Sequence, residues 1–133
     1  MFLPNKSKPH IVRVAAVTTT SYVNGTVVGL DESNAIGIEV TIVKNNETSF
    51  EFKVESSIDE GLTYGQQVAL SASGGTTTLA PNVYTISGAS LAATQVITFI
   101  VNPIKGDAIR ISTKSTGGTP TGTVAIKCIT GWV

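Results

Sequence analysis

Apolar and polar residues alternate along much of the chain. The clearest example is the segment 48–55, in which the three apolar residues of FEFKVE share one face and the three charged residues share the other. A period of two residues is typical of a β-strand with one buried face. No segment repeats apolar residues at helical spacing over three turns, and the strand-forming residues Val, Ile and Thr dominate. The pattern therefore predicts an all-β protein.

Short apolar runs follow one another, separated by Gly, Asn and Pro. They predict about eight or nine strands, at 11–17, 22–30, 35–43, 48–55, 67–71, 83–87, 95–101, 107–113 and 121–130, with loops at 56–66 and 73–78. This spacing is typical of an antiparallel β-sandwich, which we expect to be jelly-roll-like with about eight strands. The turn at 44–47 should join two runs as an antiparallel hairpin, and the Gly-Gly-Thr-Pro-Thr-Gly turn at 117–122 should reverse the chain in a second hairpin between the last two.

The length fits one domain. A chain of 133 residues buries roughly two-thirds of its unfolded surface, which is enough for one core without disulfides. We expect a single domain over 11–133, preceded by an extended arm over 1–10 that holds two prolines and two lysines. The apolar run at the start is too short for a secretion signal, and no stretch is long enough for a membrane helix. These observations favour synthesis in a cytoplasm and no membrane partner.

The charge balance argues against one class of partner. Nine Lys and Arg balance nine Asp and Glu, so no basic excess is present to neutralise a phosphate backbone, and we expect no nucleic-acid partner. Charged residues make up 14% of the chain, against about a quarter in typical domains. Two explanations stay open: a partner covers part of the surface, or a β protein rich in Thr and Ser needs few charges.

Candidate catalytic and metal-binding groups are sparse. The single histidine, His10, lies in the expected arm, and the single cysteine, Cys128, falls on the core-facing side of the last strand. Because no nucleophile has a base and an orienting group, we expect no enzyme, no catalytic residue and no cofactor. The acidic pairs lie in turns, so we interpret Asp59 as a turn residue; a Ca²⁺ site built from Asp59 and loop carbonyls is the open alternative.

Two segments depart from the pattern of a strand with one buried apolar face and one solvent-exposed polar face. The run 95–101 is apolar on both faces, and Ile97, Phe99 and Val101 fall off the expected core-facing side. In the last strand Ile129 falls opposite the core-facing residues, and Trp132 follows it. Either a loop or a second chain covers such a face. These five residues are the candidate interface.

A glycan site is the alternative of a different class. Sugar-binding sandwiches use aromatic side chains as platforms, and Tyr64 in the long loop 56–66 is the best placed. On this hypothesis the chain is a glycan-binding module of a phage tail or adhesion device.

Two stretches resemble small structural proteins of tailed phages that decorate or cement the capsid. They are FEFKVESSIDEGLTYGQQVAL at 50–70 and GDAIRISTKSTGGTPTGTVAIKC at 106–128, although this chain has Tyr64 where a Trp is commoner. The resemblance implies a β-sandwich in the virion, assembled in the host cytoplasm, with the major capsid protein as partner. It also fits a homo-oligomer, with a trimer as first expectation and a dimer as second.

Overall fold

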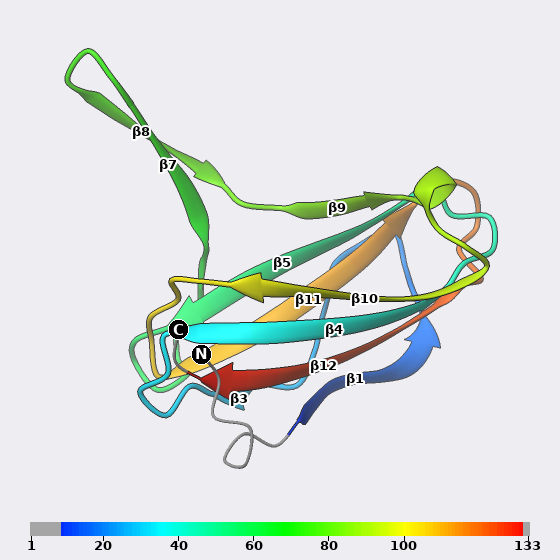
Figure 1. The fold of residues 1–133 in the computed structure, drawn as a ribbon, viewed down its shortest axis with the longest axis horizontal. Coiled ribbons are helices and arrows are strands. Elements are labelled where there is room, and N and C mark those ends of the chain that lie inside the picture. The colour runs from blue at the N-terminus through cyan, green and yellow to red at the C-terminus, as the bar shows by residue number, and fades with distance from the viewer. Residues whose placement is uncertain (1–8, 132–133) are drawn as a thin grey trace.

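A computed structural model describes residues 9–131, which fold into an antiparallel β-sandwich (Figure 1). One layer is a four-stranded sheet in the order β1 (His10–Val17), β12 (Thr123–Gly131), β4 (Ala35–Val43) and β10 (Thr94–Val101). The other layer has the order β2 (Val23–Asn24), β11 (Ala108–Thr116), β5 (Ser49–Ser57) and β6 (Gly65–Gln66), with β3 (Val28–Gly29) also paired to β11 and β9 (Tyr84–Ser87) to β5. The predicted fold class is confirmed.

Two smaller elements complete the described fold. β7 (Val68–Ser73) and β8 (Thr76–Pro81) form a separate hairpin that stands away from both sheets (Figure 1), and a single 3₁₀ turn, η1 (Gly88–Ser90), links β9 to β10. Gly74 and Gly75 at the hairpin tip have φ angles of 56° and 81°, which suit a tight two-residue turn between twisted strands. The expected loop at 73–78 is wrong, because β7 extends to Ser73 and β8, a strand that was not predicted, begins at Thr76.

The core lies between the two sheets and follows the predicted alternation. The largest fully buried side chains are Phe50, Phe52, Leu30, Ile36, Ile38, Ile42, Ile109, Ile111, Ile126, Val12, Val40 and Val54. Cys128 joins this core as predicted, and burial raises the pKa of its thiol to about 11. Its partner in the β1–β12 register, His10, is exposed.

The two expected hairpins are wrong, because each pair of strands lies in opposite sheets. β4 pairs with β12 and β10, whereas β5 pairs with β11, so the turn at 44–47 crosses from one sheet to the other. The turn at 117–122 crosses in the same way between β11 and β12. Alternation shows which face of a strand is buried but not which strand lies beside it, and short links reach across the roughly 10 Å between packed sheets.

Two expected boundaries also shift. β1 begins at His10, the last residue of the expected arm, and residues 1–8 lie outside the described part of the chain. The run 22–30 divides into β2 and β3 because the chain turns inward at Gly25. The Gly25 N–H donates to the carbonyl of Ile111 at 2.8 Å, and a Cβ on Gly25 would lie only 2.5 Å from Val12 Cγ1.

One buried carboxylate joins the two crossovers. Glu47 Oε1 accepts the backbone N–H of Asn45 at 2.8 Å, and Oε2 accepts those of Thr121 and Gly122, each at 2.8 Å. We call these three hydrogen bonds of Glu47 the clasp. A Cβ on Gly122 would overlap the carbonyl oxygen of Val43 and lie 2.5 Å from Glu47 Oε1, so the clasp requires glycine at this position. Burial opposes ionisation, but the backbone N–H groups outweigh it and lower the pKa of Glu47.

We expect Glu47→Gln to reduce the free energy of unfolding by about 2 kcal/mol at pH 7, since charge-assisted hydrogen bonds are lost in a buried site. The native pKa of Glu47 is lowered, so its stabilisation is complete above the unfolded value of about 4.3 and disappears as the pH falls through the native value. Urea unfolding of both proteins should therefore show a gap that closes on acidification. A difference in the free energy of unfolding that stays constant down to pH 3 would contradict the role of the Glu47 hydrogen bonds. Glu60→Gln is the control, because Glu60 is exposed.

Candidate docking surface

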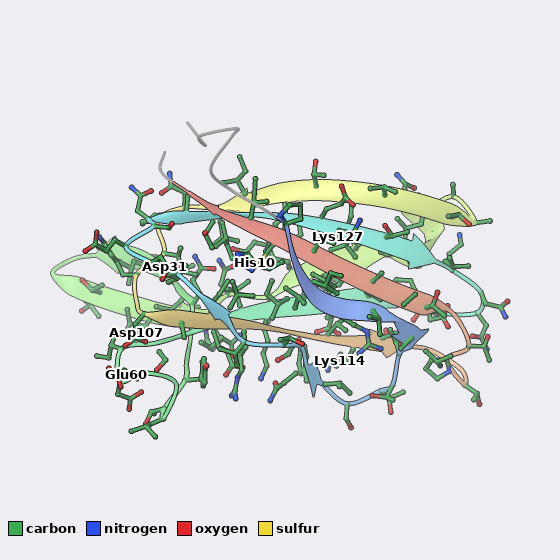
Figure 2. All side chains as sticks on the ribbon, turned by 90° about the horizontal axis from the view of Figure 1, so that it is seen from below. His10, Asp31, Glu60, Asp107, Lys114 and Lys127 are labelled. Atoms are coloured by element: carbon green, nitrogen blue, oxygen red, sulfur yellow. The ribbon has the colours of Figure 1, made fainter. Side chains whose placement is uncertain are left out.

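The outer face of the six-stranded sheet is charged. Its outward positions on β5 and β11 alternate in sign across the strands: Arg110 lies opposite Glu55, and Lys114 lies opposite Glu51. Arg110 Nε is 3.0 Å from Glu55 Oε1, and Lys114 Nζ is 3.8 Å from Glu51 Oε2. Figure 2 shows Lys114 and Glu60 on this side of the sandwich, with Lys127 on the opposite side. The face has the composition of a surface that stays in water.

Two tyrosines lie on this charged face under cationic side chains. The Tyr22 ring has Lys53 Nζ 4.7 Å and Lys114 Nζ 4.9 Å from its centroid, and its hydroxyl donates to Glu51 Oε1 at 3.1 Å. Burial, together with the Glu51 charge, raises the pKa of Tyr22 to about 12. Contacts of this kind hold an aromatic ring on a polar sheet.

Tyr64, the candidate glycan contact, is engaged within the chain. The Arg110 guanidinium lies 4.2 Å from its ring centroid, and its hydroxyl is buried with no hydrogen-bond partner among the described residues. A sugar platform needs a free ring face, and Arg110 occupies one face of this ring.

Asp59 belongs to the turn that follows β5. Its Oδ1 accepts hydrogen bonds from Ser57 Oγ at 2.7 Å and from the Thr63 N–H at 2.8 Å, and the Ser57 contact is the first cause of its lowered pKa. Residues 9–131 contain no cluster of three acidic, His or Cys side chains arranged to hold a metal ion, and no helix there is long and apolar enough to span a membrane.

The outer face of the four-stranded sheet has apolar residues on either side of one polar row. In the register across β10, β4 and β12, Ile100, Gly37 and Ile129 form one row; Thr98, Glu39 and Lys127 form the next; and Val96, Thr41 and Ala125 form a third. The side chains of Val96 and Ile100 are 55% and 59% exposed. Ile11 and Val14 extend this exposed apolar surface along β1. We call the nine residues of the three rows the apolar face.

A hollow of about 700 Å³ lies at one end of the apolar face. Gly37 has no side chain, so the row between Ile100 and Ile129 has a gap at its centre. Pro9, Thr98, Glu39 and Lys127 also contribute to its lining, which is mainly apolar. The volume is within the range of roughly 300–1,000 Å³ that small ligands occupy, and the lining suits an inserted apolar side chain.

The candidate interface residues divide between the two faces of the sheet. Val101 is buried in the core, and Ile97 and Phe99 pack against it, with the Phe99 ring 5.1 Å from that of Tyr84. The expectation that these three fall off the core-facing side is wrong. A strand that is apolar on both faces gives no sequence signal for its inner side, and the register with β4 turns Val96, Thr98 and Ile100 outward instead. Ile129 faces outward as predicted, and Trp132 lies outside the described residues.

The comparisons with known proteins show low similarity throughout. No protein-family model matches the chain, and no curated protein matches it. Among solved structures, the SPBc2 prophage-derived protein YomS aligns over 94% of this chain and 92% of its own, with a TM-score of 0.44 and 16% identity. The carbohydrate-binding module CBM6cm-2 from Cellvibrio mixtus lichenase 5A, solved with cellotriose, aligns over 92% and 85%, with a TM-score of 0.43 and 13% identity. A structure described as CBM4 aligns over 89% and 75%, with a TM-score of 0.42 and 14% identity.

These structures include a phage-derived protein and carbohydrate-binding modules, and their similarity to this chain is too low to favour either function. The two outer faces of the sandwich are the remaining evidence for a function.

The two tyrosines of the charged face form a matched pair for mutation. We expect Tyr64→Phe to leave the free energy of unfolding unchanged or to raise it, because it removes a buried hydroxyl without a partner. We expect Tyr22→Phe to lower it by about 1 kcal/mol, because its hydroxyl donates to Glu51. Urea unfolding at pH 7 measures both values. A loss above about 1 kcal/mol in Tyr64→Phe would show that this hydroxyl is paired.

Proposed function

We propose that the chain is a non-enzymatic structural protein of a tailed-phage virion that decorates or cements the capsid. The observation that supports this proposal is the contrast between the two outer faces of the sandwich. One bears cross-strand charge pairs, and the other has exposed Val96 and Ile100 beside a hollow over Gly37.

An apolar outer face has a physical cost when it stays in water. Contiguous exposed apolar area is uncommon on soluble monomers and marks sites of protein contact. Covering it gains roughly 25 cal/mol for each Å² of apolar surface removed from water. A subunit bound to a shell through one sheet and hydrated on the other needs this division. The resemblance of 50–70 and 106–128 to decoration proteins makes the phage capsid the proposed shell and the major capsid protein the proposed partner.

Glycan binding is the second candidate, and the volume of the hollow is the observation in its favour. Thr98, Glu39 and Lys127 would supply hydrogen bonds to sugar hydroxyls there. The lining offers Phe99 as its one aromatic residue among those described, and this ring packs inward against Tyr84. A hollow without an outward aromatic platform fits an apolar protein side chain better than a sugar.

Quantitative mass spectrometry of purified virions tests the first proposal. We expect copy numbers of the same order as the capsid subunit. A handful of copies per particle would contradict decoration and favour a connector or tail part.

An add-back experiment tests the apolar face itself. Particles lacking the protein should bind the wild type and reject Ile100→Asp, since a charge would be buried without a partner. Leu62→Asp is the control, because Leu62 is 87% exposed and lies in the turn after β5, away from the apolar face. Equal binding of the two variants would contradict docking through this face.

A glycan array with the isolated protein separates the two candidates. Binding that is lost in Glu39→Gln would support a sugar site in the hollow, and binding lost in Tyr64→Ala would support one at the loop 56–66. We expect no glycan to bind.

A further inference from the structure

The hairpin of β7 and β8 is the most exposed part of the described chain. All twelve of its strand residues are exposed, and it forms a sheet of its own. Figure 1 shows it leaving the sandwich near the end where β4 begins and β10 and β12 end. An isolated two-stranded hairpin is at best marginally stable in water. We therefore expect another surface to pack against this hairpin and stabilise it.

The hairpin has one apolar face. Leu70 lies directly opposite Leu79, and Val68 opposite Pro81, so these four side chains project to the same side. Leu70 and Leu79 are 69% and 61% exposed. The opposite side carries the pairs Ser71 with Thr78 and Ser73 with Thr76. That opposite side also carries the small pair Ala69 and Ala80. Because successive residues of a strand point to opposite faces, the two leucines project together as a knob from one side, and the other side has only small and polar residues.

The hairpin and the strand that borders the hollow belong to an uncharged part of the chain. No Asp, Glu, Lys, Arg or His occurs from 61 to 104, a stretch that contains β6 to β10. Exposed strand edges are normally protected against pairing by Lys, Pro or a bulge. β10 has none of these over Thr94–Val101, and its register with β4 is unbroken. The hairpin and β10 therefore lack such charges, while Glu39 and Lys127 of the neighbouring strands contribute to the lining of the hollow.

The hollow has the features that the leucine knob requires. Gly37 leaves its floor open, and Ile100 and Ile129 stand on either side in the same row. We infer that the β7–β8 hairpin of one copy docks on the apolar face of a second copy, with Leu70 and Leu79 in the hollow over Gly37, and that the exchange is reciprocal. The partner is thus a second copy of this chain.

The area and the position of the two surfaces favour a reciprocal exchange. A stable interface buries roughly 800 Å² on each partner, and the apolar side of one hairpin consists of only six strand residues. When each copy both gives and receives a hairpin, the same interface contains two such contacts. The hairpin leaves the sandwich near the end where β4 begins (Figure 1), and the hollow is lined by Gly37, Ile100 and Ile129 near the same end of the sheet, so a two-fold axis close to that end can relate the two contacts.

This inference rests on the proposed function and adds a contact between copies: it assigns the hollow at one end of the apolar face to a second copy and leaves the rest of that face to the shell. It is tested without virions. A dimer of the isolated protein that is absent from virions would leave the inference standing and remove the virion role. A virion component that is monomeric in isolation would do the opposite.

Sedimentation velocity of the full chain provides the first test. We expect a concentration-dependent dimer that Leu70→Asp and Ile100→Asp each weaken by on the order of 100-fold in Kd, as expected for central interface residues. Ser71→Asp is the matched control, because it adds the same charge to the same strand on the polar side. Circular dichroism checks that every variant is folded. A monomeric wild type, or a dimer that Leu70→Asp leaves intact, overturns the inference.

Mixing the two weakened variants tests the reciprocal geometry. The Ile100→Asp copy keeps an intact hairpin and the Leu70→Asp copy keeps an intact hollow, so the mixture should recover one of the two contacts and dimerise more tightly than either variant alone. No recovery on mixing contradicts the pairing of this hairpin with this hollow, even where both single variants dissociate.

A disulfide provides the direct geometric test. Leu79→Cys combined with Ile129→Cys should form an intermolecular crosslink under mild oxidation, whereas either single variant should not form this hairpin-to-sheet bond. Cys128 is a suitable bystander, because it is buried and its pKa is raised to about 11. Mass spectrometry of the tryptic fragments identifies the bond, and its absence from a dimer that forms in solution overturns the inference.

Discussion

The Glu47 carboxylate fixes where the chain passes from one sheet to the other, and the rest of the structure follows from that clasp. It joins Asn45 in one crossover to Thr121 and Gly122 in the other. β12 therefore enters its sheet beside the end of β4, and their register runs without a break from Thr123 opposite Val43 to Gly131 opposite Ala35. That register brings Ile129 beside Gly37 at the far end. A buried polar contact at one end of the sandwich thus sets the hollow at the other.

The two outer faces of the sandwich differ in the side chains that they expose. The β5 and β11 side pairs its charges across strands and places tyrosine rings under cations, which suits contact with water. The β10, β4 and β12 side exposes apolar residues around Gly37, and the hairpin offers a leucine pair of matching character. On our proposal, the hairpin and this face are the complementary surfaces of two copies.

Sequence periodicity predicted the core well, because alternation such as that of 48–55 is set by burial of one face alone. It failed for strand neighbours: both sheets face one core, so the turns at 44–47 and 117–122 look the same whether they form hairpins or crossovers. It also failed for β10, where Val96 and Ile97 are equally apolar and only the partner strand decides which is buried. The hairpin was detectable, because Gly74-Gly75 between two short runs is a strong signal for a tight turn. The hollow was not, because the row of Ile100, Gly37 and Ile129 joins three distant segments.

Hydroxyl-radical footprinting, before and after assembly, tests most directly whether the apolar side of this sandwich is the side that becomes covered. It reports the solvent exposure of individual side chains in the same sample. We expect Ile100, Leu70 and Leu79 to lose most of their reactivity on assembly, while Ile58 and Leu62, in the exposed turn after β5, retain theirs. Protection of Ile58 and Leu62 with Ile100, Leu70 and Leu79 still reactive would contradict this expectation.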